Sequence, residues 1–589
     1  MPLKKRLFLP ILLTLLFQGC SSQKVIHEDP LPNAEKQIHQ SKPDIASKDV
    51  PGSKPIVARP LTTPVLYHLL SGEIAGQRGQ FKQAVEHYME ALRLAPDPKV
   101  AERTARIAVF ARNEKSALEA AQIWVKLEPE NMEAQQVTAA LLVRTGQLDA
   151  ALMHLEHILA ATGKSEKTER KGFMLVVSLL SKEQDKQAAM DVMDKLVADR
   201  QQNSAALYAY SHLALLVGEL SKAAVSVEKA LKLQPDWIDA HMLQANILIR
   251  QGRHAEALKK LEETTAEYPA EVRLRLYYAR KLIDEKQYKQ AHEQFSEVLE
   301  RQPENADALY AMGLLGLQLR QLDEAQENFE KLLKTGKRSD EANYYLGELH
   351  ESKKQPQEAI KYYLGVRKNP QHIDAQIRVA SLLARMGKLD EARNQLHRVH
   401  VPNLEVQLRL YLAEGELLVA SQKSEEAFEL YTQALEQMPT NARLLYARAL
   451  VAEKVKHLDV AIQDLELILK NESNNIEALN ALGYTLVDRT GRVQEGVGYI
   501  EKALTAKPGD PAIMDSMGWG YYRLGKYDKA LEFLRRAYAK MPDPEIASHL
   551  GEVLWVSGDQ AEARKIWDAA LQQTPKHNLL LDVMQRFIE

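Results

Sequence analysis

Cys20 carries the only thiol in this chain of 589 residues, and it ends a stretch typical of a secretory leader. The leader begins with the basic residues Lys4, Lys5 and Arg6 and continues with an apolar core over 7–17. A bilayer requires about 20 apolar residues, so this short core favours a processed leader over a transmembrane anchor. The only cysteine therefore stands where a leader is cut and where a thiol is open to covalent modification.

The end of the leader resembles the lipobox of bacterial lipoproteins, whose usual form is Leu, a small residue, Gly or Ala, and then Cys. Phe17 and Gln18 depart from that form, whereas Gly19 and Cys20 match it. The resemblance implies cleavage before Cys20 and acylation of its thiol, with chains such as palmitate. Ser21 replaces the Asp that commonly retains such proteins in the inner membrane, so we expect an outer-membrane anchor facing the periplasm. An ordinary leader with a chance cysteine is the alternative.

Familiar catalytic and metal-binding patterns do not occur in the sequence. HExxH, the Walker loop, GxSxG and GxGxxG are all missing. Ser-x-x-Lys occurs at 21–24 and 226–229, where we interpret it as a chance match, and the histidines lack the spacing of metal ligands. With Cys20 acylated, no thiol nucleophile is left. The sequence thus predicts no catalytic residue, no metal site and no cofactor.

Aromatic and polar residues at regular offsets are the remaining candidates for recognition. Tyr and Trp are typical anchors of protein interfaces. The predicted partner-binding residues are Tyr310, Tyr344, Tyr446, Asn480, Tyr484, Asp515, Trp519, Tyr522, Glu552 and Trp555. The alternative is that some of the aromatic rings pack between neighbouring units, in which case their removal lowers the melting temperature instead of the affinity.

These candidates share offsets in a unit that recurs about every 34 residues, from about residue 65 to 575. In the clearest copy, Gly518 lies in a first helix and Gly525 ends it. Ala530 and Leu534 follow in a second helix, and Pro542 closes the unit. Residue types and spacing resemble the tetratricopeptide repeat. That resemblance implies stacked helix pairs in a superhelix, with a long concave face made by the first helices.

The repeat pattern also predicts which residues meet inside each pair. Two helices approach closely only where one carries a small residue, and a larger side chain fills the space beside it. The predicted small residues of first helices are Gly313, Gly347, Gly415, Gly483, Gly518 and Gly551. The predicted larger partners include Phe295, Phe329, Tyr363, Tyr431 and Leu465. Turn glycines such as Gly218 and Gly252 are predicted to be left-handed.

Composition agrees with an all-α protein. Hydrophobic residues make up 45% of the chain, and the net charge of -3 gives no basic field for nucleic acid. We predict a signal peptide over 1–19, a proline-rich flexible membrane tether over 20–60 and a superhelix of about 15 repeat units over 61–576. A capping helix over 577–589 is predicted to follow. A tether that also docks a partner stays open.

Leader, tether and repeats together resemble a particular class of bacterial outer-membrane lipoprotein, the adaptors of periplasmic carboxyl-terminal processing proteases. The likeness rests on the stretches 66–79, 97–108, 515–525 and 542–555. It implies a non-enzymatic scaffold that binds and activates such a serine protease. It also implies delivery of peptidoglycan hydrolases for degradation, which restrains the cutting of cell-wall cross-links.

Two rival functions remain open from the sequence. A scaffold lipoprotein for polysaccharide export or pilus assembly would share the anchor and the repeats. An enzyme, such as a glycosyltransferase with a repeat array, would need a separate catalytic domain, for which the repeats leave no room.

Overall fold

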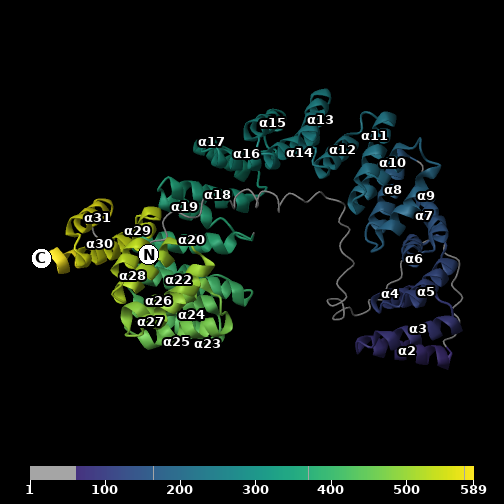
Figure 1. Cartoon of the computed structure of the whole chain (residues 1–589). Coiled ribbons are helices and arrows are strands. Elements are labelled where there is room, and N and C mark those ends of the chain that lie inside the picture. Colours follow the sequence, from purple (N-terminus) through teal and green to yellow (C-terminus); the bar gives the residue numbers. More distant parts are fainter. Residues whose placement is uncertain (1–61, 164, 369, 576, 589) are drawn as a thin grey trace. The chain divides into compact units, whose positions relative to one another are not determined.

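The computed structural model of the protein describes residues 62–163, 165–368, 370–575 and 577–588 (Figure 1). These residues form α-helices joined by short turns, and none of them lies in a strand, so the predicted all-α class is confirmed. They divide into two compact units, one ending at Thr145 and one beginning at Gly146. The predicted signal peptide, Cys20 and the tether lie outside the described residues.

Helices of the first unit belong to the start of the repeat region. They are α2 (Thr63–Gln77), α3 (Phe81–Leu94), α4 (Pro98–Phe110), α5 (Glu114–Leu127) and α6 (Met132–Arg144).

Helices of the second unit continue the same alternation. The first group is α7 (Leu148–Thr162), α8 (Glu166–Leu180), α9 (Lys186–Ala198), α10 (Ser204–Val217), α11 (Leu220–Leu233), α12 (Ile238–Arg250), α13 (His254–Glu267), α14 (Val272–Asp284), α15 (Tyr288–Arg301), α16 (Ala306–Gln318), α17 (Leu322–Lys334), α18 (Ser339–Ser352) and α19 (Pro356–Tyr363). The second group is α20 (His372–Arg385), α21 (Leu389–His397), α22 (Leu404–Ala420), α23 (Ser424–Gln437), α24 (Ala442–Lys454), α25 (Leu458–Asn471), α26 (Ile476–Arg489), α27 (Val493–Ala506), α28 (Pro511–Arg523), α29 (Tyr527–Lys540), α30 (Pro544–Ser557), α31 (Gln560–Gln573) and α32 (Asn578–Ile588).

Helices pack mainly on their neighbours in the chain, as the repeat predicts. The closest packing joins the two helices of a pair, such as α26 with α27 and α28 with α29, and each second helix then contacts the next first helix. The exception surrounds the polar stretch near residue 164, where α7 contacts both α8 and α9 while α8 packs on α10.

Pairing of a small with a large residue is confirmed inside the helix pairs. A Cβ atom added at Gly313 would lie 2.6 Å from the Phe329 ring, and one at Gly347 would lie 2.6 Å from the Tyr363 ring. Both rings are fully buried. Because a side chain at either glycine would collide with an aromatic ring, these glycines fix how closely each first helix lies on its second helix.

Turns inside the pairs use the left-handed backbone. Gly218 has φ of 93° and Gly252 has φ of 77°, as predicted. Lys286, Arg320 and Lys456 adopt the same conformation with φ of 59°, 60° and 65°, although they carry a Cβ atom. The short turn therefore imposes the left-handed conformation whichever residue stands there, and glycine only makes it less costly.

Helix starts are set by caps that the sequence supplies. The Asn305 side chain accepts a hydrogen bond from the Ala308 N–H at the start of α16. Asp510 caps α28 and is followed by Pro511, whose missing N–H costs nothing at a first helical position. At the far end, α32 buries Leu580 and Val583 in one core cluster with Trp567.

Candidate functional site

Predicted recognition residues of the last pairs gather on three first helices, α26, α28 and α30, which contact one another in sequence order. Since each pair repeats the same offsets, residues far apart in the chain lie on one face. These residues are Asn480 and Tyr484 on α26, Asp515, Trp519 and Tyr522 on α28, and Glu552 and Trp555 on α30. We call them, with His549, the C-terminal cluster.

His549 of α30 lies at the centre of the C-terminal cluster. Its Nδ1 atom is 3.0 Å from both carboxylate oxygens of Asp515. Its ring stacks on Trp519 with centroids 4.3 Å apart, and its Nε2 atom is 3.4 Å from the Tyr484 hydroxyl. One imidazole therefore joins α26, α28 and α30, and both His549 and Asp515 are buried.

Trp519 is packed inside the array. Only 7% of its surface is exposed, and its indole Nε1 donates a hydrogen bond of 3.0 Å to Asp488 of α26. An aromatic residue that binds a partner exposes its ring in the free protein, whereas the Trp519 ring is already covered by α26 and α30. Burial thus favours the alternative interpretation, in which Trp519 packs between units. No bound partner tests this residue, so its role in recognition stays a prediction.

The last two pairs and the terminal helix share a second polar network. The Tyr522 hydroxyl donates to Glu552 at 3.2 Å, and Arg586 of α32 forms an ion pair with the same carboxylate at 3.1 Å. Trp555 stacks on Trp567 with centroids 5.7 Å apart. Trp555 and Tyr522 keep part of their surface exposed, so they are more accessible than Trp519.

Burial and neighbouring carboxylates together set the pKa values in the C-terminal cluster. Burial disfavours the charged imidazolium of His549, but the facing Asp515 and Glu545 carboxylates outweigh that effect and raise the pKa of His549. Burial also raises the pKa of Glu545, although His549 opposes it. The pKa of Tyr522 rises to about 12, first through burial and then through Glu552.

Asn480 Oδ1 is buried without a hydrogen-bond partner among the described residues.

Tyr310 and Tyr344 lie in a separate region, on α16 and α18. The Arg338 guanidinium sits 4.1 Å above the Tyr310 ring. The Tyr344 hydroxyl donates to Asp374 at 2.5 Å. Tyr446 of α24 is half-buried and packs against the core cluster that includes Leu444. The structure therefore does not bring these three tyrosines into the C-terminal cluster.

Arg378 of α20 organises the charges beside Tyr344. Its guanidinium lies 3.0 Å from Glu348, 3.2 Å from Glu351 and 3.1 Å from Asp374. Burial raises the pKa of Glu348 in spite of this arginine. One cation thus links carboxylates of α18 and α20 and holds the first helices of two successive pairs together.

Comparisons with known proteins identify the repeat. Profiles described as tetratricopeptide repeat match residues 66–98, 209–272, 248–315, 310–373, 412–476 and 516–578. A TPR repeat-containing protein of Pseudomonas aeruginosa, PA4667, is 33% identical over 488 residues, which span 83% of this chain and 82% of that protein. This chain belongs to the tetratricopeptide-repeat family.

Solved structures align with parts or most of the chain. The thermophilic TPR protein TTC0263 of Thermus thermophilus is 25% identical, covers 31% of this chain and 96% of that chain, and has a TM-score of 0.28. Cut9-Hcn1 of the APC/C is 16% identical, covers 90% of this chain and 97% of that chain, and has a TM-score of 0.32.

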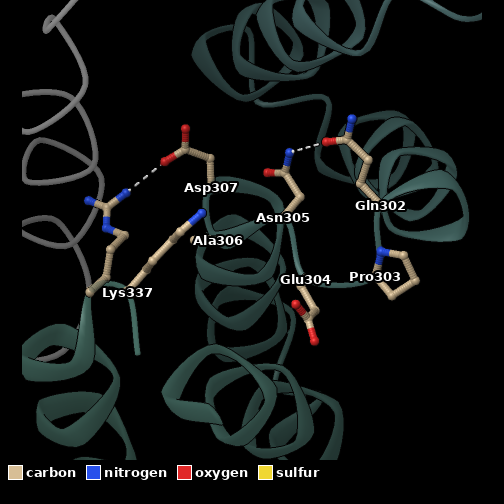
Figure 2. A pocket seen from close by; sticks show the side chains of 8 residues that line it. Gln302, Pro303, Glu304, Asn305, Ala306, Asp307 and Lys337 are labelled. Atoms are coloured by element: carbon tan, nitrogen blue, oxygen red, sulfur yellow. Dashed lines mark hydrogen bonds and ion pairs between the residues drawn. The ribbon is translucent and has the colours of Figure 1, made fainter. Parts of the chain in front are cut away.

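Pockets between the repeats offer little chemistry. One of them is an open depression of about 760 Å³ at the turn before α16 and just before α18 (Figure 2). It carries both charges, and its Asp307 is paired with Arg338 at 3.1 Å. Among the described residues, no group of three His, Cys, Asp or Glu side chains could hold a metal, and no helix is long and apolar enough to cross a membrane.

Sequence reasoning missed several residues of these networks. His549, Asp488 and Arg586 were not among the predicted contacts, and neither was Arg378. For His549 a signal existed, because it stands next to a position of α30 that is expected on the concave face, and it lies 34 residues after Asp515. Arg586 carried no such signal, because α32 lies outside the repeat register.

Proposed function

We propose that the protein is a lipid-anchored adaptor of the outer membrane that binds and activates a periplasmic serine protease of the carboxyl-terminal processing type. It presents peptidoglycan hydrolases to that protease for degradation. The observation that carries the proposal is the likeness of the stretches 66–79, 97–108, 515–525 and 542–555 to such adaptors. As a tetratricopeptide-repeat protein, the chain belongs to a family of typically non-enzymatic scaffolds that bind protein partners.

Placement of those stretches supports a scaffold with contacts at both ends. The first spans most of α2 and the second most of α4, while the other two cover most of α28 and α30. All four are first helices, which line the face that repeat proteins use for binding. An acyl chain on Cys20 would hold this array at the membrane, and the residues before α2 would set its distance from the surface.

Reconstitution tests the proposal directly. Turnover of a purified wall hydrolase is measured with the protease alone, with this chain alone, and with both proteins. We expect no turnover by this chain alone and faster turnover by the pair than by the protease alone. Turnover without any protease, or a pair no faster than the protease, would refute the adaptor role. Affinity capture that recovers secretin or export subunits instead of a protease would favour the rival scaffold.

A matched pair of variants locates the contact. Tyr310→Ala removes a half-buried ring from a first helix, whereas Met153→Ala removes a side chain that is 72% exposed on α7. Removing an anchor that contributes about 2 kcal/mol to binding lowers the affinity for the protease about thirtyfold. We expect that loss for Tyr310→Ala and none for Met153→Ala, with melting temperatures measured for both. Equal affinities of the two variants for the protease would show that Tyr310 lies outside the interface. The outcome of the reconstitution assay would not change.

A further inference from the structure

Two successive helix pairs of the second unit have shortened second helices. Helix α19 has 8 residues and α21 has 9, whereas α17 and α23 on either side have 13 and 14. The segments 364–368 and 398–403 follow the shortened helices and take the place of their missing turns. We call these segments the two loops. They contain none of the predicted recognition residues.

Each of the two loops is held in place by one buried valine. Val366 is 1% exposed and belongs to a core cluster with Ala375 of α20. Val399 is 8% exposed and belongs to the cluster against which Ile373 of the same helix packs. Because α21 packs along α20 and runs back toward its start, both loops lie at the same end of α20. They therefore form neighbouring parts of one surface.

The two loops present three exposed cations. Arg367, Lys368 and Arg398 are all exposed, and none of their side chains pairs with a carboxylate in the part of the chain that the structure describes. The Asp340 carboxylate accepts hydrogen bonds from the backbone N–H groups of Arg367 and Lys368, at 3.1 and 2.9 Å. Asp340 thus fixes the backbone of the first loop, and the surface keeps three positive charges against this one carboxylate.

Apolar side chains lie among these cations. Leu364, Val401 and Leu404 are 47%, 42% and 59% exposed. The carboxylate next to them in the sequence, Glu405, is paired with Arg443 of α24 at 3.4 Å. A surface that binds a membrane is typically rich in Trp, Tyr or Phe, and neither loop contains one of these residues. The mixture of cations and aliphatic side chains therefore favours a protein partner over a lipid surface.

We propose that the two loops bind an acidic segment of a partner protein, in which apolar side chains alternate with carboxylates. Guanidinium groups such as those of Arg367 and Arg398 bind carboxylates through paired hydrogen bonds. The apolar side chains of the segment cover Leu364 and Leu404. This surface is additional to the first-helix face on which the proposed adaptor function relies, and it does not depend on the identity of the protease or of its substrates.

Charge reversal tests the electrostatic part of the proposal. The full chain carries Cys20→Ala so that no acyl group takes part, and the probe is a fluorescent peptide with one Leu after every two Glu. Arg367→Glu, Lys368→Glu and Arg398→Glu together should weaken peptide binding at least about tenfold in fluorescence anisotropy, because attraction becomes repulsion. The affinity of the unreversed chain should also fall about tenfold between about 50 and 300 mM salt. An affinity that does not change with salt would overturn the proposal.

A matched control separates these loops from the overall charge of the protein. It makes the same change of charge at three other exposed lysines, with the substitutions Lys82→Glu, Lys115→Glu and Lys289→Glu. We expect this control to bind the peptide as the unreversed chain does, with melting temperatures measured for both triple variants. Equal weakening in the two triple variants would show that only the net charge matters and would overturn the proposal.

The apolar part has its own test. Leu364→Ser with Leu404→Ser should weaken binding of the Glu-Glu-Leu peptide about fivefold and leave binding of a Glu-Glu-Ser peptide unchanged, because only the first peptide loses apolar contacts. Equal affinity of the unaltered loops for both peptides would overturn the proposal. Vesicles containing phosphatidylglycerol supply the other source of negative charge. Binding to them that is tighter than binding to the peptide, and that is lost on charge reversal, would assign the surface to a membrane and overturn the proposal too.

Discussion

Replacing Trp519 with alanine tests whether the C-terminal cluster is packed core. The indole is buried in a cluster with Val487 and Ile500, stacks on His549 and donates a hydrogen bond to Asp488. Truncating a buried Trp to Ala costs about 3–5 kcal/mol, because the contacts are lost and a cavity remains. We therefore expect the local stability of α26, α28 and α30 to fall by about 4 kcal/mol, which is close to a thousandfold in the opening equilibrium.

A local measurement is needed, because repeat arrays can unfold one segment at a time. Hydrogen exchange of α26, α28 and α30 should accelerate while that of α12 and α14 stays unchanged. Trp519→Phe is the matched control, since it keeps a ring over His549 and loses the hydrogen bond to Asp488, for about 1 kcal/mol. A loss below about 1 kcal/mol in Trp519→Ala, together with weaker partner binding, would refute the packing argument and restore the anchor interpretation.

Two further predictions concern titration and membrane attachment. Because Asp515 and Glu545 raise the pKa of His549 above 6.5 in the folded state, the ion pair contributes fully below about pH 6.5 and is lost as pH rises through the folded pKa. The melting temperature of the C-terminal pairs should thus fall as the pH rises above about 6.5, and His549→Gln should flatten this extra dependence, as differential scanning calorimetry would show. Cys20→Ala should release the protein into the soluble fraction of cell extracts, and a variant that stays with the membranes would place the anchor elsewhere.

Much of the fold could be predicted from the repeat pattern, because the contacts that define a repeat unit involve residues close together in the sequence. A glycine opposite an aromatic ring, as at Gly313 and Phe329, is readable within one unit of sequence. The left-handed turns at Lys286 and Lys456 were not foreseen, because glycine is only the least costly residue there and the sequence showed none. The departure around α7 and α8 lies where the sequence predicts a break, at the weakest repeat copy near 170–203. Which helices pack on each other there was not predicted, because a local pattern does not contain the distance between helices.

The candidate site was predicted less well. A residue's position in the repeat specifies the side of the helix on which it lies, but it does not determine how exposed the side chain is. Tyr484, Asp515 and Trp519 do lie on neighbouring first helices, as their register requires. Their mutual contacts depend on His549, which was not among the predicted recognition residues. Whether a side chain at a concave-face position reaches solvent depends on the distance between successive first helices. That distance is a property of the tertiary structure.

Gly520 explains why the spacing is small at this point. A Cβ atom there would lie 2.8 Å from Val497 of α27, so any larger residue would push α28 away from the preceding pair. Close approach of α28 brings the neighbouring Trp519 against Asp488 of α26 and closes the face that the offset predicted to be open. In the central pairs the Leu450 side chain of α24, at the same offset as Trp519, is still 43% exposed. The same repeat position is therefore core in one pair and surface in another.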